Sequence, residues 1–230
     1  MKKFFKSLML ISVCLGLSAT VNAKTFRYAT TGDILGLDPH ANNEGPTNTM
    51  KGNIYGRMLH RKSDLSLEPD LATKWEKLDA NTWRFSLRRG VKFHNGNDFN
   101  ADDVLFSYKR QTQEASDMSF ALATIKQINK VDDYTVDLIT KGPDPILLLN
   151  MPMFYIVDKE WIEANNAFEV VRASGSTNFA NVNTNGTGPF KVVEWIQDTR
   201  IVLEPFEGYW GKNQIQHNLT KAVFTPISND

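Results

Sequence analysis

Three pairs of strand-like segments, each joined by a short polar turn, restrict the fold of this chain more than any other feature. The pairs are 75–78 with 83–87, 125–131 with 135–139, and 190–196 with 200–203. β-Branched and aromatic residues on both sides of a short turn are typical of antiparallel hairpins. Apolar residues at helical spacing separate the pairs, at 101–113, 144–151 and 159–166. The sequence therefore predicts a mixed α/β (α+β) lobe, not a parallel doubly wound sheet.

Two more strands are predicted near the ends of the chain, at 25–30 and 221–226. A loop rich in Gly, Pro, Asn and Asp follows the first strand from Gly32 to Gly45. Apolar residues then recur at helical spacing after Pro46, and Thr47 or Asn48 is available as the helix N-cap. A long polar loop at the end of a strand is a candidate for ligand contact.

The first 23 residues have the order of a secretory signal peptide. Three lysines precede an apolar run at 8–17, and small residues lead to an A-x-A-like site ending at Ala23. The run is too short to cross a bilayer, which takes about 20 residues in a helix. We therefore expect cleavage after Ala23 and export to the periplasm; an uncleaved anchor is the alternative.

Charge and cysteine content then exclude several classes of site. Cleavage removes three of 26 basic residues and leaves 23 against 26 acidic ones, which does not favour a polyanionic partner such as DNA. The only cysteine, Cys14, lies inside the leader. The exported part therefore has no disulfide and no thiolate metal site, and we expect its stability to come from its apolar core.

Residues 88–110 gather polar side chains that resemble a catalytic cluster, but their order is typical of structural boundaries. Asn95-Gly96 is a strong turn dipeptide, and Asn100 can cap the helix that follows. Asp102 and Asp103 fall in the first turn, where the helix dipole favours negative charge. Adjacent residues on a helix point in different directions, so these two cannot act as a facing acid–base pair.

The remaining chemical candidates also have structural interpretations. His94 is expected to be a partly buried, hydrogen-bonded side chain, because the four histidines show no metal-binding spacing. Gly186 and Gly188 precede a strand instead of a helix, which favours a close backbone approach over a phosphate cradle. Motifs of hydrolases and nucleotide-binding loops are absent from the sequence, although a catalytic triad assembled in space stays open. Four aromatic residues could stack on ligands but fit core packing better: Trp75, Trp83, Tyr209 and Trp210.

Read in order, six segments resemble the extracellular solute-binding proteins of ABC transporters, family 5, the dipeptide-, oligopeptide- and nickel-binding group, and most of all its dipeptide branch. The segments are LDPH at 37–40, LEPDLATKW at 67–75, TWRFSLRRGVKFHNG at 82–96, FNADDV at 99–104, GTGPF at 186–190 and GYWG at 208–211. Each is weak alone, but the six occur in the family's order and span nearly all of the exported chain.

The resemblance implies a type II periplasmic-binding-protein fold with two lobes around a cleft. This chain would supply lobe I, with a core from 24–64 plus 178–230 and a subdomain inserted at 65–177. The sequence stops at Asp230 directly after a predicted strand. We therefore expect that the chain is cut short and that lobe II is absent.

The resemblance also implies where a solute binds. In peptide-binding relatives, the loop after the Asp-Pro segment offers main-chain groups to the peptide, as an added strand pairs with a sheet edge. In this sequence the matching residues are Asn43, Glu44 and Gly45, and Phe120 is a weaker candidate from the inserted subdomain. The expected partners are a small peptide or related solute and an inner-membrane ABC permease. No catalytic residue, cofactor, metal or nucleic acid is expected, and the protein is expected to be a monomer.

Two alternatives remain open from the sequence. The chain could be a secreted hydrolase or carbohydrate-active domain whose acidic residues converge only in space. It could also be a truncated remnant that binds nothing. A facing carboxylate pair in a closed pocket would favour the hydrolase, whereas an open concave face lined by residues 41–45 would favour the receptor.

Overall fold

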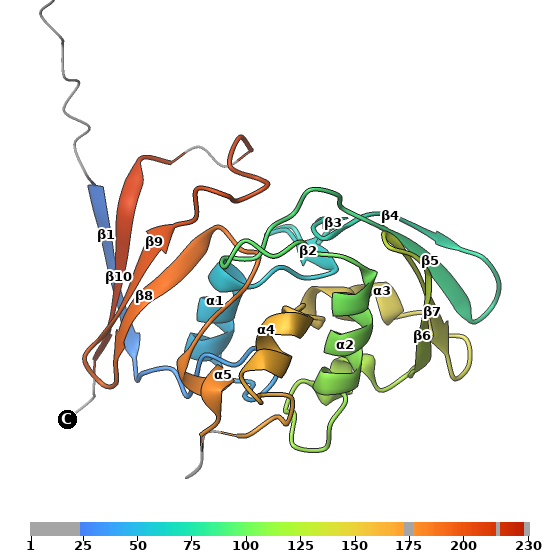
Figure 1. Cartoon of the computed structure of the whole chain (residues 1–230), viewed down its shortest axis with the longest axis horizontal. Coiled ribbons are helices and arrows are strands. Elements are labelled where there is room, and N and C mark those ends of the chain that lie inside the picture. The colour runs from blue at the N-terminus through green and yellow to red at the C-terminus, as the bar shows by residue number, and fades with distance from the viewer. Residues whose placement is uncertain (1–23, 173–176, 215–216, 228–230) are drawn as a thin grey trace, which may run out of the picture.

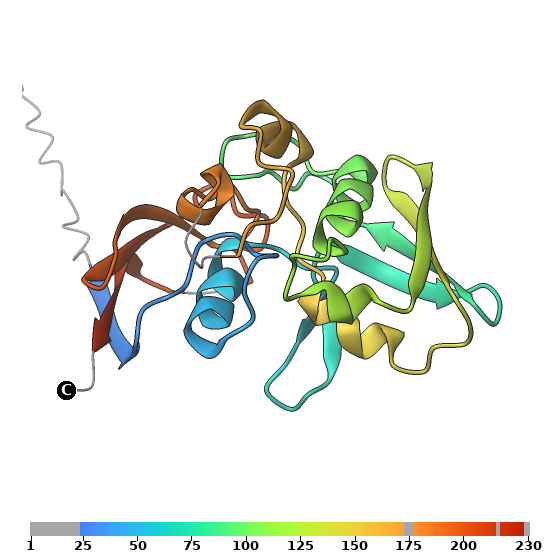
Figure 2. The same cartoon turned by 90° about the horizontal axis from the view of Figure 1, so that it is seen from below.

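The computed structural model describes residues 24–172, 177–214 and 217–227, so the predicted signal peptide and the end at Asp230 lie outside the described residues. Two four-stranded sheets stand at opposite ends of the described part, and helices fill the space between them (Figure 1, Figure 2). This arrangement confirms the predicted mixture of hairpins and helices.

The first sheet has the order β1-β10-β9-β8. Its strands are β1 (Lys24–Thr31), β10 (Leu219–Ile227), β9 (Arg200–Pro205) and β8 (Phe190–Ile196). β8 and β9 form the predicted hairpin, whose turn contains Asp198 with a positive φ of 56°. β1 pairs with β10 in parallel, so both strands end on the same side of the molecule.

The second sheet is antiparallel throughout and has the order β4-β5-β7-β6. Its strands are β4 (Ala72–Lys77), β5 (Thr82–Leu87), β7 (Thr135–Thr140) and β6 (Ile125–Asp132). Both hairpins of this sheet match the prediction. The pair β2 (Leu59–Arg61) and β3 (Leu67–Pro69) was not predicted, because three residues are too few to show an alternation.

Four of the helices in the described residues correspond to predicted ones, with two corrections, and the short helix at 179–182 was not predicted. They are α1 (Gly45–Ile54), α2 (Ala101–Gln111), α3 (Leu147–Asn150), α4 (Lys159–Ala164) and α5 (Phe179–Val182), with 3-10 turns η1 (Ser119–Leu122) and η2 (Met151–Met153). The helix predicted at 144–151 is only α3, since Pro145 and Pro152 bracket it and cannot donate helical hydrogen bonds. The N-cap of α1 is Glu44 instead of Thr47 or Asn48.

Helix α2 joins two apolar cores. Val104 belongs to the core of the second sheet, together with Phe85 and Leu138. Phe106, two residues later, belongs to the core under the first sheet, together with Phe224. Because neighbouring positions of α2 are buried on both sides, the helix fixes the two cores relative to each other.

Close packing of backbone explains the glycine pair before β8. A Cβ atom on Gly186 or Gly188 would overlap the backbone of Ile54 at the end of α1. The N–H of Gly188 donates to the carbonyl of Ile54 at 2.9 Å. The predicted close approach is therefore confirmed.

Among the described residues, no helix is both long enough and apolar enough to cross a membrane.

Candidate functional site

The loop between β1 and α1 starts where the parallel strands β1 and β10 end, and it crosses the side of the molecule that Figure 2 views. Ligands of open α/β sheets commonly bind beyond the carboxyl ends of such strands. Residues 33–35 line a cavity of about 640 Å³ there, together with residues of α5 and of the β8–β9 turn. Asp33 fixes the start of the loop by accepting hydrogen bonds from the Asp198 N–H (2.8 Å) and the Trp195 indole (3.2 Å).

A fully buried ion pair lies beneath the middle of the loop. The Arg110 guanidinium in α2 donates to both carboxylate oxygens of Asp38, at 2.8 and 2.5 Å. Burial alone would raise the pKa of Asp38, but the charge and hydrogen bonds of Arg110 hold it below its ordinary value. The same guanidinium donates to the carbonyl of Ala167. The loop is therefore anchored to α2 through a pair whose ionisation is secured.

His40 completes this network as a neutral side chain. Its Nε2 lies 3.0 Å from the carbonyl of Tyr155, and its Nδ1 lies 3.1 Å from Arg110 Nη1. A carbonyl oxygen can only accept a hydrogen bond and a guanidinium can only donate one, so Nε2 carries the proton and Nδ1 accepts. Burial and the Arg110 charge lower the pKa of His40 to about 3.

Three successive carbonyls of the loop are each held by a different donor. The hydroxyl of Ser116 donates to the His40 carbonyl at 2.7 Å, and the Asp117 N–H donates to the Ala41 carbonyl at 3.3 Å. The ammonium group of Lys51 in α1 donates to the Asn42 carbonyl. Burial lowers the pKa of Lys51 to about 8. The backbone is therefore fixed up to Asn42 and becomes exposed at the next residue.

Asn43, a predicted ligand residue, is exposed. Its side-chain oxygen accepts from the Asn48 amide at 2.8 Å. Among the described residues, neither its backbone N–H nor its carbonyl makes a hydrogen bond. Both main-chain groups are therefore available to an added strand.

Glu44 and Gly45, the next two predicted residues, form the start of α1. The Glu44 carboxylate caps the helix by accepting from the Thr47 N–H at 2.9 Å, so this side chain has a structural partner. Pro46 fits the first turn, where its missing N–H would be unpaired in any case. Gly45 is exposed, and its carbonyl accepts from the Thr49 hydroxyl at 3.0 Å.

Phe120, the fourth predicted residue, is 50% exposed and lies in η1. Its segment is the one whose Ser116 and Asp117 hold the carbonyls of residues 40 and 41. The structure thus brings the two predicted segments together by hydrogen bonds. Contact of these four residues with a solute stays a prediction.

A second cavity, of about 650 Å³, lies beside β2, β3 and the C-terminal end of α1. Trp210 lines it and carries the Arg88 guanidinium over its ring, 3.7 Å from the centroid. Burial raises the pKa of Asp70 in its wall to about 6, against the opposing charge of Arg57. Trp75 and Trp83 pack against the core of the second sheet, as expected for structural aromatics.

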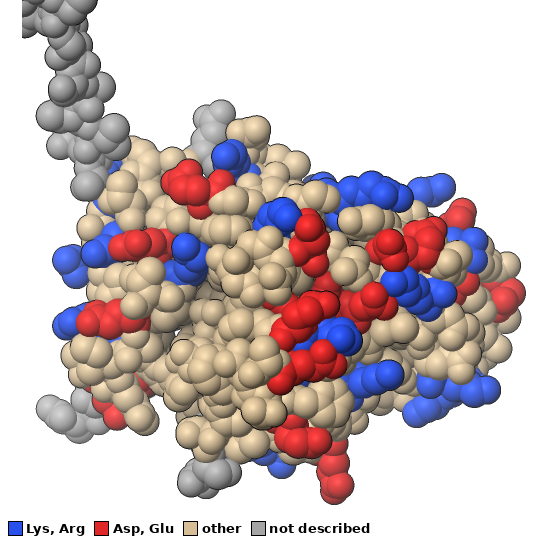
Figure 3. Space-filling model, in the orientation of Figure 1, with Lys and Arg blue, Asp and Glu red and all other residues tan. Residues whose placement is uncertain are grey.

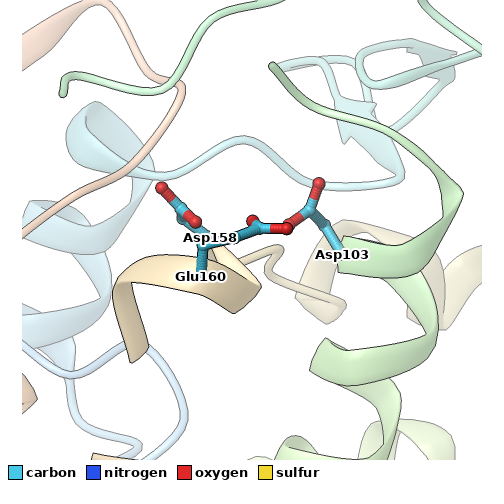
Figure 4. Close-up of side chains that lie close together, drawn as sticks. All are labelled: Asp103, Asp158 and Glu160. Atoms are coloured by element: carbon cyan, nitrogen blue, oxygen red, sulfur yellow. The ribbon is translucent and has the colours of Figure 1, made fainter. Parts of the chain in front are cut away.

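Three carboxylates converge between α2 and α4, a cluster that the sequence did not reveal (Figure 4). Oxygens of Asp103, Asp158 and Glu160 lie within 4.8 Å of one another. Asp103 accepts from the backbone N–H groups of Asn100 (2.9 Å) and Lys159 (3.0 Å). Burial, with the nearby carboxylates, raises the pKa of Asp103 to about 7.

Asp158 has a full set of donors. One oxygen caps α4 by accepting from the Trp161 N–H at 3.0 Å. The other accepts from three amides, those of Asn95 (2.9 Å), Asn97 (2.9 Å) and Asn185 (2.7 Å). The cluster is therefore explained by helix capping and turn fixation. In Figure 3, acidic side chains gather on the face over α2 and α4, with basic side chains among them.

The structural interpretation of residues 88–110 is confirmed. Asn100 and Asp103 form a reciprocal capping box at the start of α2. Gly96 adopts a positive φ of 99° in the predicted turn. His94 is hydrogen-bonded through both ring nitrogens, with Nε2 at 3.1 Å from the Gly188 carbonyl and Nδ1 accepting from the Gly186 N–H at 3.3 Å.

The sequence of this chain matches a family model and the sequences of known proteins. The family model described as bacterial extracellular solute-binding proteins, family 5 Middle, matches residues 66–230. The dipeptide-binding protein of Escherichia coli strain K12 is 32% identical over 223 residues, which cover 86% of this chain and 41% of that protein. Di/tripeptide-binding protein 2 of Pseudomonas aeruginosa is 29% identical and covers 96% of this chain and 45% of its own length.

Solved structures of binding proteins are similar to this fold. The periplasmic binding protein DppA of Helicobacter pylori, in complex with the peptide STSA, has a TM-score of 0.76 and 29% identity over 90% of this chain and 43% of its own. OppA of Burkholderia pseudomallei has a TM-score of 0.77 at 21% identity, which supports the fold alone. The predicted periplasmic-binding-protein fold is therefore confirmed, and the chain spans about two fifths of the length of the first two of these relatives, 41% and 45%.

Proposed function

Because the chain belongs to the bacterial extracellular solute-binding proteins of family 5, we propose that it is part of the substrate-binding component of an ABC importer for short peptides. The observation that carries the proposal is the exposed main chain of Asn43, whose N–H and carbonyl make no hydrogen bond to the part of the chain that the structure describes, while the three preceding carbonyls are held. Main-chain pairing is indifferent to side chains, so such a rim suits peptides of many sequences.

The relatives support a peptide as the solute. Two of those reported above are named for binding dipeptides or tripeptides, and a solved neighbour holds a four-residue peptide. The family is one of binding proteins, not of enzymes. The hydrolase alternative needed a facing carboxylate pair in a pocket, but the oxygens of Asp103 and Asp158 cap helices and fix turns.

We further propose that this lobe binds in the periplasm together with a second lobe and delivers its solute to a membrane permease. A solute that contacts both lobes stabilises the closed form over the open one, which shifts an existing population. Micromolar affinity corresponds to about −8.2 kcal/mol. If each lobe supplies about half of this free energy, one lobe alone binds near millimolar.

The division of the lobe remains a proposal as well. A core from 24–64 plus 178–230 and an inserted subdomain from 65–177 match the two sheets, since β1, β8, β9 and β10 lie in the former and β4 to β7 in the latter. Export after removal of residues 1–23 is proposed on the leader's composition. A monomer is proposed as well.

The test is titration of the isotope-labelled 230-residue chain with a short peptide, followed by NMR. Millimolar peptide is expected to shift the backbone amide signals of residues 43–45. In Asn43→Pro, which removes the N–H donor, the affinity is expected to fall about tenfold, as for a lost hydrogen bond. The matched control Asn43→Ala keeps the donor and is expected to bind like the wild type.

Three results would contradict these proposals. Equal weakening of binding in Asn43→Ala and Asn43→Pro would implicate the side chain instead of the backbone. Peptide-induced shifts confined to the cavity beside Trp210 would place the site elsewhere. Micromolar binding by this chain alone would contradict the proposal that each of two lobes supplies about half of the binding free energy.

A further inference from the structure

A lysine is buried directly beneath the proposed binding rim. Lys51 in α1 is 1% exposed. Among the described residues, no carboxylate lies within 4.0 Å of its ammonium group. Asp38, Glu44 and Asp117 favour the charged form from beyond ion-pair distance, but burial outweighs them, so an apolar residue would suit this helix position better for stability alone.

The ammonium group instead contacts the loop that precedes its own helix. It donates to the carbonyl of Asn42 and to the side-chain oxygen of Asn48, the latter at 3.3 Å. It also lies 5.9 Å from the centre of the Tyr155 ring. Side chains on a helix point back toward its N-terminus, which explains how Lys51 reaches a residue before α1.

The contact holds the last fixed residue before the exposed rim. The side-chain oxygen of Asn42 does not help to hold this residue, because it is buried and has no hydrogen-bond partner among the described residues. Its backbone carbonyl is bound by Lys51, while the two carbonyls before it are bound by Ser116 and Asp117. Without the lysine, the fixed backbone would end one residue earlier.

We propose that Lys51 is a positioning residue of the binding site: its buried ammonium group holds the Asn42 carbonyl and so presents the main chain of Asn43 to a peptide. The role in binding rests on the proposed function, but the positioning does not. Lys51 itself is covered and does not contact the solute. The contacts of its ammonium group with the Asn42 carbonyl and the Tyr155 ring therefore hold the rim in position.

Hydrogen exchange of the 230-residue chain, measured without peptide, tests the positioning. In Lys51→Met the amides of Ala41 and Asp117, whose hydrogen bonds lie beside Asn42 in the loop, are expected to exchange about tenfold faster, because the charge-assisted hydrogen bond that holds the loop has been lost. Lys51→Arg keeps N–H donors and is expected to stay closer to the wild type. Lys141→Met is the matched control, since Lys141 also donates to a carbonyl, that of Ala123 at 2.7 Å, but on the exposed surface.

Global stability distinguishes positioning from a merely structural role. The removal of a buried charge is expected to leave the urea midpoint of Lys51→Met unchanged or higher while the loop exchanges faster. A lower midpoint with uniformly faster exchange of all amides would overturn the proposal, and so would unchanged exchange of the Ala41 and Asp117 amides. If Lys51→Met does not fold, Lys51→Gln replaces it under the same criteria. Since no peptide is present, failure here is distinct from failure of the Asn43→Pro test.

Discussion

Asp38 under the loop between β1 and α1 and Asp103 at the start of α2 are buried to the same extent, each with 1% of its surface exposed, yet their ionisation differs. Asp38 accepts two hydrogen bonds from the Arg110 guanidinium, and its pKa is lowered. Asp103 accepts two hydrogen bonds from neutral backbone N–H groups, and burial raises its pKa to about 7.

The difference shows which interaction keeps a buried carboxyl group ionised. Burial is the largest effect on the pKa of Asp103 and raises it, and the neighbouring Glu160 and Asp158 raise it further, whereas the hydrogen bonds from backbone N–H groups favour the carboxylate form but do not outweigh burial. A full opposite charge at contact distance reverses the outcome for Asp38. The loop that carries the proposed rim therefore keeps its anchor over a wide pH range, while the α2–α4 junction responds to pH near neutrality.

The largest expected effect is the loss of Arg110. Arg110→Met leaves the Asp38 carboxylate buried without a counter-charge, and the free energy of unfolding is expected to fall by about 3–5 kcal/mol. Urea denaturation followed by circular dichroism measures the change. The double variant Arg110→Met with Asp38→Asn is expected to recover part of the loss, because it removes the orphaned charge.

A partly exposed ion pair that also has two hydrogen bonds is the control. Arg84 and Asp137 also form two hydrogen bonds, both at 2.8 Å, but across the surface of the second sheet. Arg84→Met is expected to cost less than about 1 kcal/mol. Equal losses in Arg84→Met and Arg110→Met would show that burial of the pair does not matter, and the comparison above would fail.

The next effect is a pH dependence at Asp103. Its pKa is about 7 in the folded state against 3.8 for an ordinary aspartate. Between these values the folded state binds a proton that the unfolded state has released, so this group's contribution to stability falls as pH rises from about 4 to 7. Relative to Asp103→Asn, the wild type is expected to lose about 2 kcal/mol of unfolding free energy between pH 5 and 7.

Asp102→Asn is the control for this pH profile. The Asp102 side chain is 51% exposed and pairs with Lys130 at 3.0 Å. Its replacement is expected to change the free energy of unfolding by less than about 1 kcal/mol at each pH. A flat difference between the wild type and Asp103→Asn over this range would mean that Asp103 is already ionised in the folded state.

Local sequence signals predicted most of the fold. The strands of each hairpin lie close in sequence, so alternation and turn residues, such as those between Lys77 and Thr82, determine them. The capping pair Asn100 and Asp103 is equally local. The parallel pairing of β1 with β10 joins the two ends of the described chain, and no local sequence pattern predicts it.

The site was predicted less completely, because its essential contacts are distant in sequence. Asp38 and Arg110 are 72 residues apart, and neither lies in a pattern that indicates an ion pair. Three asparagines from two distant segments, Asn95, Asn97 and Asn185, converge on Asp158. Lys51 follows the buried Met50 in α1, where the helical pattern indicates a core face but not a buried charge. The resemblance predicted a rim at residues 43–45, which stays a prediction, and it did not reveal what holds this backbone.

The smallest expected effect separates the cap of α2 from the charge of Asp103. Asn100→Ala removes the side-chain acceptor that binds the Asp102 N–H at 2.7 Å but keeps the backbone N–H that donates to Asp103. The free energy of unfolding is expected to fall by about 1 kcal/mol, equally at pH 5 and pH 8. Asn100→Ser, which retains a capping oxygen, is expected to stay near the wild type in the same urea titrations. A loss that grows between pH 5 and pH 8 would mean that the Asn100 side chain, and not backbone N–H groups alone, sustains the ionised form of Asp103.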